Sequence, residues 1–295
     1  MNSRRFVLLC IALLPFGATP ATAVPTVTQI IPRGLTAGGL TIVTLRGTQL
    51  DQGESRLLSP LIMNQTVIKA TAGELQLRVE VAADVVSGLY RFRVANQAGV
   101  SNAWIAGVDG LPQVVFQDTT AQIPVALSGT LAGSSILETR LHIKKGTELV
   151  AEVECRRLGG QARPVLRLLD PRGVQVAWGR YRSAPQGDAR LSVKVSVSGE
   201  YTLQLHDLLY KAPASSFRLK VGSFQYATMT FPLAVETAAN VPLAFVDSNI
   251  ITAPMKLWQS AAFPGIGIAC PQQGVMASGP LPQVIVSGYP EWVEG

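Results

Sequence analysis

Short runs in which apolar and polar side chains alternate cover most of the chain, and a period of two predicts β-strands. The clearest run is residues 199–207 (GEYTLQLHD), in which Tyr201, Leu203 and Leu205 fall on one face. Residues 165–169 form a second run, which an Asp-Pro-Arg-Gly turn closes, and residues 174–178 leave that turn as a third. We expect these three strands to form the centre of a β-sandwich.

Similar runs occur on both sides of this centre. Before it they cover residues 27–31, 40–47, 66–70, 74–81 and 88–95, and around it residues 122–130, 139–143, 148–155, 190–197 and 216–221. Glycine turns separate the runs, and 15% charged residues with 27 Gly and 19 Pro favour strands and turns over long surface helices. The sequence therefore predicts an all-β protein made of tandem β-sandwiches.

An internal repeat divides the chain. Residues 27–50 align without gaps on residues 227–250, with Thr28 on Thr228 and Pro32 on Pro232. Residues 110–115 (GLPQVV) resemble residues 288–293 (GYPEWV) in the same way. The glycines of the first copy at 38 and 39 are alanines in the second, so we expect residues 224–295 to be a degenerate copy of residues 24–109.

The first 23 residues are expected to be a secretory signal. A basic start with Arg4 and Arg5 precedes an apolar stretch of signal length and an Ala-Thr-Ala site ending at Ala23. An uncleaved anchor is the alternative, but prolines and a glycine interrupt a stretch that is already short for a membrane span. Cleavage removes two arginines and no acids, so the net charge falls from +6 to +4. We expect an exported, soluble chain without a later membrane span.

Two cysteines then remain, Cys155 and Cys270. They fall in different expected modules, so a disulfide would join one module to another. Two buried free thiols are the simpler interpretation, because Cys155 alternates within a strand pattern and unpaired cysteine is often buried.

The N-terminal strands resemble the IPT/TIG immunoglobulin-like family. The resemblance rests on Pro32 after the first strand, Gly34 and Gly38-Gly39 in the turn, Gly47, and the Ala-Asp-x-x-x-Gly segment at 83–88. It implies an Ig-like module over residues 24–109 that spaces or presents other modules. Nucleic acid is not an expected partner, since the arginines near these turns are scattered.

The following segment resembles the bacterial pre-peptidase C-terminal (PPC) family, whose fold is a jelly-roll-like β-sandwich. The matching features are Lys145-Gly146, the run 165–173 (VLRLLDPRG), and the G-x-Y-x-L motif at 199–203. The order of the modules resembles that of large exported proteins of Planctomycetes. The expected organisation is a signal at 1–23, an IPT/TIG-like module at 24–109, a PPC-like module at 111–223 and a degenerate IPT/TIG-like module at 224–295.

Relatives of the PPC family often carry aspartates that hold calcium, which needs six to eight oxygen ligands. Here arginines and apolar residues replace most of those positions, and only Asp118, Asp170 and Asp188 remain as weak metal candidates. No metal and no cofactor are therefore expected.

Catalytic groups are also sparse. The two histidines, His142 and His206, alternate onto the polar faces of their strands, so we expect them to be solvated. Glu152 and Glu154 share a strand face, as a glycosidase pair might, but such carboxylates usually come from different strands across a cleft, and a solvated face is the preferred interpretation. Hence we expect no enzyme.

Arginines crowd the PPC-like module. Those that could form a polyanion-binding surface, with two aromatic residues among them, are Arg156, Arg157, Arg163, Arg180, Arg182, Trp178 and Tyr181. Guanidinium groups bind planar anions such as carboxylates. The alternative is ordinary solubilising charge that local carboxylates neutralise.

The sequence thus predicts a secreted, periplasmic or cell-surface protein that binds or spaces and does not catalyse. The first alternative is an accessory protein for acidic polysaccharide or another polyanion, and a cell-surface protein is a further possible partner. The second alternative is a non-catalytic remnant of a secreted peptidase.

Overall fold

The computed structural model describes residues 23–120, 122–181, 188–236, 243–246, 248–249, 256–260, 263–270 and 282–289. The expected signal segment, apart from Ala23, and the candidate Arg182 lie outside the described residues. Within these ranges the chain is all-β and contains no helix, which confirms the predicted fold class. No helix suited to crossing a membrane occurs in the part of the chain that the structure describes.

The first sandwich consists of two sheets that enclose one apolar core. One sheet has the order β1 (Thr26–Ile31), β3 (Leu40–Thr48), β6 (Glu74–Val81) and β5 (Ile62–Thr71). The other has the order β2 (Gly34–Thr36), β9 (Trp104–Asp109), β7 (Gly88–Asn96) and β4 (Arg56–Leu58), with β8 (Gly99–Val100) paired to β7. Alternation fills the core, because Val43 and Leu45 of β3 point inward while Leu40 and Ile42 stay exposed.

The second sandwich also consists of two sheets. One, which we call the junction sheet, has the order β10 (Gln113–Val115), β12 (Val125–Gly133), β19 (Ala212–Gly222), β14 (Glu148–Glu154) and β17 (Arg190–Lys194). The other, the outer sheet, has the order β11 (Thr119–Thr120), β13 (Ile136–Ile143), β18 (Gly199–Asp207), β15 (Pro164–Leu169) and β16 (Gln175–Arg180). The three strands expected at the centre, β18, β15 and β16, are neighbours in the outer sheet, and Tyr201, Leu203 and Leu205 point into the core.

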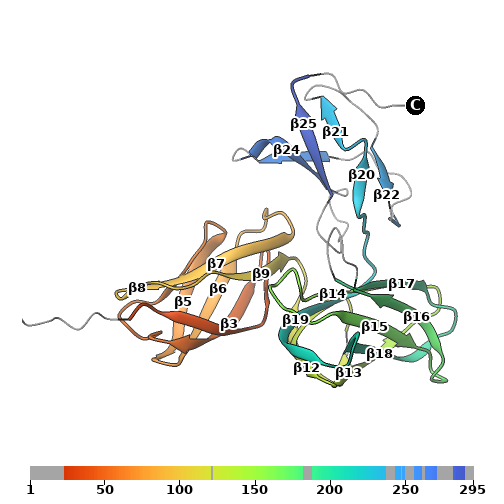
Figure 1. The fold of residues 1–295 in the computed structure, drawn as a ribbon, viewed down its shortest axis with the longest axis horizontal. Helices are drawn as coiled ribbons and strands as arrows, with labels where there is room; N and C mark the ends of the chain where they lie inside the picture. Colours follow the sequence, from red (N-terminus) through yellow and green to blue (C-terminus); the bar gives the residue numbers. More distant parts are fainter. Residues whose placement is uncertain are drawn as a thin grey trace, which may run out of the picture.

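The third segment contains two small sheets. They are β20 (Met229–Phe231) with β22 (Ala244–Val246), and β21 (Ala234–Glu236), β25 (Gln283–Ser287), β24 (Phe263–Cys270) and β23 (Lys256–Ser260) in that order. Figure 1 shows these strands in blue, above the second sandwich.

The strand pairing of this segment reproduces that of the first sandwich. Ile31 pairs with Thr44 in β1 and β3, and Phe231 pairs with Ala244 in β20 and β22, which are the same positions 200 residues later. The parallel pair β2 and β9 likewise has its counterpart in the parallel pair β21 and β25. The aligned segments therefore share topology and register in these strands.

The first and second sandwiches are in direct contact (Figure 1). The backbone N–H of Arg33 donates to Ser128 Oγ at 2.9 Å, and Arg33 Nη2 donates to the Leu158 carbonyl at 2.9 Å. A small separate core of Leu111, Ala126, Val150 and Phe224 lies where the connecting segments cross the junction sheet. The outer face of the junction sheet is thus covered by other parts of the chain.

Candidate functional site

One end of the outer sheet brings together several of the predicted arginines. The Tyr181 N–H donates to the Pro164 carbonyl, and the Leu208 N–H donates to the Arg163 carbonyl, each at 2.8 Å. Val165 pairs with Arg180 across β15 and β16. Arg156 lies over the Tyr181 ring, 5.0 Å from the ring centre to Cζ. We call Arg156, Arg163, Arg180, Trp178 and Tyr181 the arginine corner.

The cations of the arginine corner face solvent. Arg156, Arg163 and Arg180 are exposed, and no carboxylate within the described ranges lies at ion-pair distance from any of them. Trp178 is 57% exposed. It stands on the same face of β16 as Arg180, because residues two apart on a strand share a face. Arg156 Nη1 donates to the Gln161 carbonyl at 3.3 Å. The corner therefore presents exposed guanidinium groups without a carboxylate partner in the described ranges, beside an open aromatic ring.

Asp207 fixes the turn that borders this corner. Its carboxylate accepts hydrogen bonds from the backbone N–H groups of Arg163 at 2.7 Å and Leu209 at 2.9 Å, and a longer one from Lys211 at 3.4 Å. Burial raises the pKa of this carboxyl, but the backbone donors and the nearby Arg163 charge outweigh it and hold the pKa below its ordinary value. The ionised Asp207 carboxylate therefore has a structural role, since it fixes the backbone of the turn through these hydrogen bonds.

His206 is buried, which corrects the expectation that it is solvated. It does lie on the outer face of β18, but Tyr210 folds back over it, with the two rings parallel and 4.6 Å apart. Tyr210 reaches this position with a left-handed backbone, φ 52°. The Nδ1 atom of His206 contacts the Asp207 carbonyl at 2.9 Å. His142, in contrast, is exposed as predicted.

Arg157 lies apart from the arginine corner. Its side chain is 11% exposed and is paired with Glu152 and, at 2.9 Å, with Asp188. Burial lowers the pKa of this guanidinium, but the charge of Glu152 and its neighbours raises it above the ordinary value overall. Arg157 is a structural cation beneath the surface.

The Glu152 and Glu154 carboxylates are also buried, which corrects the prediction of a solvated face. Both lie on the outer face of the junction sheet, and Glu154 meets the first sandwich there, since a Cβ on Gly107 would lie 3.1 Å from its Oε2 atom. Arg218, with a fully buried side chain, donates to Glu154 Oε2 at 2.9 Å and to Asp109 Oδ1 of the first sandwich at 2.7 Å. Lys220 Nζ lies 3.0 Å from Glu154 Oε1. Burial raises the pKa of Glu154, but Lys220 and Arg218 outweigh it and lower the pKa well below its ordinary value.

Each of the three metal candidates has a different environment, and none shares its partners with another. Asp188 accepts from Arg156 and Arg157, Asp170 accepts from the N–H groups of Arg172 and Val174 in its own turn, and Asp118 is exposed. No group of three His, Cys, Asp or Glu side chains suited to a metal ion occurs in the described ranges.

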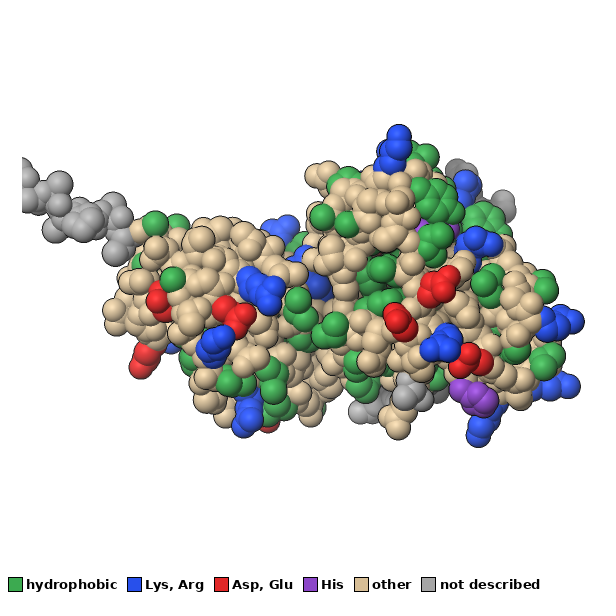
Figure 2. Space-filling view, turned by 90° about the horizontal axis from the view of Figure 1, so that it is seen from below, with side chains coloured by type: hydrophobic (Ala, Val, Ile, Leu, Met, Phe, Trp, Pro, Cys, Tyr) green, Lys and Arg blue, Asp and Glu red, His purple; other side chains and the backbone are tan. Residues whose placement is uncertain are grey.

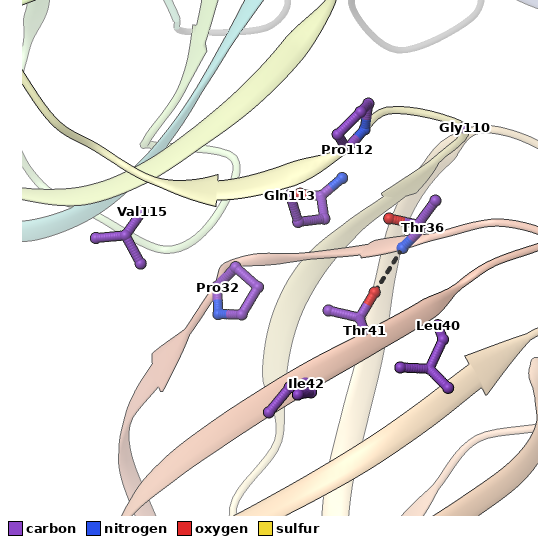
Figure 3. A pocket seen from close by; sticks show the side chains of 9 residues that line it. All are labelled: Pro32, Thr36, Leu40, Thr41, Ile42, Gly110, Pro112, Gln113 and Val115. Atoms are coloured by element: carbon purple, nitrogen blue, oxygen red, sulfur yellow. Dashed lines mark hydrogen bonds between the residues drawn. The ribbon is translucent and has the colours of Figure 1, made fainter. Parts of the chain in front are cut away.

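A pocket of about 620 Å³ lies between the sandwiches. Its lining residues, drawn in Figure 3, are Pro32, Thr36, Leu40, Thr41, Ile42, Gly110, Pro112, Gln113 and Val115. None of them is charged. Sequence patterns gave no sign of this pocket, because its two walls come from different modules.

Comparison with known families concerns the first sandwich. The model of quinohemoprotein amine dehydrogenase, alpha subunit domain III, matches residues 24–102. No curated protein matches the chain. The first sandwich is therefore similar to that domain, with β1 to β8 inside the matched range.

Several solved structures are similar at low identity. PliG of Aeromonas hydrophila, a periplasmic inhibitor of g-type lysozyme, is 14% identical over 38% of this chain and 97% of its own, with a TM-score of 0.27. SGBP-B of Bacteroides ovatus, solved with a mixed-linkage heptasaccharide, is 10% identical over 66% of this chain and 74% of its own, with a TM-score of 0.24. The secreted serine protease VesC of Vibrio cholerae is 7% identical over 64% of this chain and 48% of its own, with a TM-score of 0.25.

Proposed function

We propose that this protein is an exported, non-catalytic binding protein of the periplasm or cell surface, and that its ligand is an acidic polysaccharide held at the arginine corner. The observation that carries the proposal is the group of exposed guanidinium groups, beside the open ring of Trp178, that have no carboxylate partner among the residues described by the structure. Other cations of this sandwich, among them Arg157, Arg218 and Lys220, are paired with carboxylates.

The chemistry of the corner suits uronic acid chains. A guanidinium group binds a carboxylate through two parallel hydrogen bonds, which a neutral sugar cannot offer. The exposed aromatic ring provides a flat apolar surface for the C–H face of a sugar ring. Figure 2 shows Lys and Arg side chains at the margin of the second sandwich, next to hydrophobic ones, rather than one broad basic field.

The proposal can be tested with polygalacturonate, alginate and neutral dextran as probes in affinity gel electrophoresis of the mature chain. We expect retardation by the two acidic polymers only. The double variant Arg163→Ala/Arg180→Ala should weaken binding at least about tenfold, since two charge-assisted contacts are lost. Trp178→Ala should also weaken binding to the acidic polymers, because it removes the flat apolar surface for the sugar ring.

Arg140→Ala is the matched control. Arg140 lies on the same sheet, is similarly exposed, and is 3.8 Å from Glu200. Its loss removes one positive charge without touching the corner, as each single variant, Arg163→Ala or Arg180→Ala, removes one within it. Equal weakening by Arg140→Ala would show unspecific charge attraction and overturn the proposal. Hydrolysis of any of these polymers, or of casein, by the purified chain would contradict the non-catalytic part.

We also propose the finer module assignment. In it, residues 24–109 are an IPT/TIG-like module, 111–223 a PPC-like module, and 224–295 a second, degenerate IPT/TIG-like module. The repeated strand register supports the relation between the first and the last. Residues 1–23 would direct export.

A further inference from the structure

β10 is an edge strand whose outer side pairs with no other strand in the described part of the chain. It pairs in parallel with β12 alone, at one margin of the junction sheet. Edge strands carry backbone N–H and C=O groups that can pair with another extended chain. In this protein the edge borders the pocket between the sandwiches.

The register identifies which backbone groups of β10 are free. The Pro112 carbonyl accepts from the Ala126 N–H at 3.0 Å, and the Phe116 N–H donates to the Ser128 carbonyl at 2.8 Å. Residues 113, 114 and 115 pair with residues 126, 127 and 128. In a parallel pair this pattern directs the N–H and the C=O of Val114 toward β12. The N–H and C=O groups of Gln113 and Val115 then point away from it.

Gln113 and Val115 are also the residues of β10 that line the pocket. Figure 3 shows them with Pro112 on one side, and Pro32, Leu40 and Ile42 of the first sandwich on the other. Leu40 is 55% exposed, Ile42 47% and Val115 57%, so the walls offer apolar surface to an incoming side chain. The lining is uncharged, which matches an uncharged occupant and disfavours a charged one that would lose its hydration.

We propose that this groove binds an extended, uncharged polypeptide segment of a partner protein, which adds to the junction sheet as a strand beside β10. The backbone of the segment pairs with Gln113 and Val115, and alternate apolar side chains enter the space above Ile42 and Leu40. This mode of recognition takes its affinity from main-chain hydrogen bonds and its selectivity from the alternate side chains. It is independent of the arginine corner.

The test uses the mature chain and a fluorescein-labelled octapeptide of alternating Val and Thr, followed by fluorescence polarisation. Val115→Pro removes one edge donor and leaves the bonds to β12 intact, since the Val115 N–H points away from that strand. We expect Val115→Pro to weaken binding at least about tenfold and Val115→Thr, which keeps the donor and the shape, to weaken it less than about threefold. Backbone amide exchange at Gln113 and Val115 should slow when the peptide is present.

Ile42→Lys is the second variant, and it decides the result if Val115→Pro does not fold. It places a charge in the groove at an exposed position, and we expect at least about tenfold weaker binding. The proposal is overturned if the wild-type chain does not bind the peptide at about 1 mM. It is also overturned if both variants weaken peptide binding by less than about tenfold. A wild-type dimer that Val115→Pro dissociates would assign the edge to a second copy, and would equally overturn it.

Discussion

Arg218 is a cation with no exposed surface, and its guanidinium joins two sandwiches through Asp109 and Glu154. Gly34 and Gly107 leave the space that it occupies, because a Cβ on Gly107 would lie 2.6 Å from Arg218 Nη1. Alternation along β14 puts Glu152 and Glu154 on one face, as expected, and Lys220 and Arg218 of β19 pair with them there. The sequence pattern does not say that another sandwich covers that face.

Glu154→Gln should destabilise the fold by about 3–5 kcal/mol, since it leaves Arg218 and Lys220 buried with one carboxylate fewer. The wild-type chain should also lose stability as the pH falls below 4.5, because the unfolded Glu154 then takes up a proton while the folded one, with its lowered pKa, does not. Urea unfolding between pH 7 and pH 3 measures both effects. Glu148→Gln on the exposed end of the same strand is the control and should change stability by less than about 0.5 kcal/mol.

Cys155 is a free, buried thiol at the end of β14. Burial raises its pKa to about 12. In a Cys270→Ser variant of the mature chain, we therefore expect no reaction with an aromatic disulfide reagent at pH 8 until the protein is unfolded by urea. Rapid reaction of the folded variant would contradict the buried position.

At the scale of the element, the turn after β18 illustrates what alternation leaves out. Period two assigns His206 to the outer face of its strand, and it does lie there. Its burial depends on Tyr210, four residues later, which folds back with a left-handed backbone. Such a turn depends on the three N–H donors that Asp207 gathers, and no periodic pattern encodes them.

Asp207→Ala removes the acceptor of these N–H groups. We expect a loss of about 1–3 kcal/mol in the free energy of unfolding, because three backbone N–H groups lose a charged acceptor. Proton NMR should show the His206 ring leaving its stacked position. Asp118→Ala, at an exposed carboxylate of the same sandwich, should leave both the stability and the His206 signals unchanged.

The central strands were predictable, whereas several edge strands were not. Residues 199–207 and 165–169 alternate over enough positions to fix β18 and β15, and the observed bounds agree closely. β10 and β11 have three and two residues, too few for a periodic signal. The arginine corner was predictable as a group of residue types, but only the fold separates Arg157 from its exposed members.

At the scale of the whole molecule, the two sandwiches should behave as one body. Their contact buries the ion pair between Arg218 and Asp109 and the hydrogen bonds of Arg33, so separation of the sandwiches would break these interactions. This differs from modules on a flexible linker, which move independently by default.

Gly107→Ala tests this coupling. The added methyl group meets the Arg218 guanidinium, which cannot move aside without breaking its bonds to Asp109, Glu154 and Gln113. We expect the variant to lose cooperative melting of the first two sandwiches in calorimetry and to show a larger radius of gyration by small-angle scattering. Gly110→Ala, whose Cβ would meet nothing within 4 Å, should behave like the wild-type chain.

The covered face of the junction sheet also determines how this protein can be divided for experiments. A recombinant piece that begins after Asp109 would carry Arg218 and Glu154 without the first sandwich that covers them, and we expect it to express poorly. A piece that starts at residue 24 and continues beyond Phe224 and Tyr226 keeps that face covered, because these residues pack on it. Ligand measurements on the second sandwich in such a piece should report on the natural molecule.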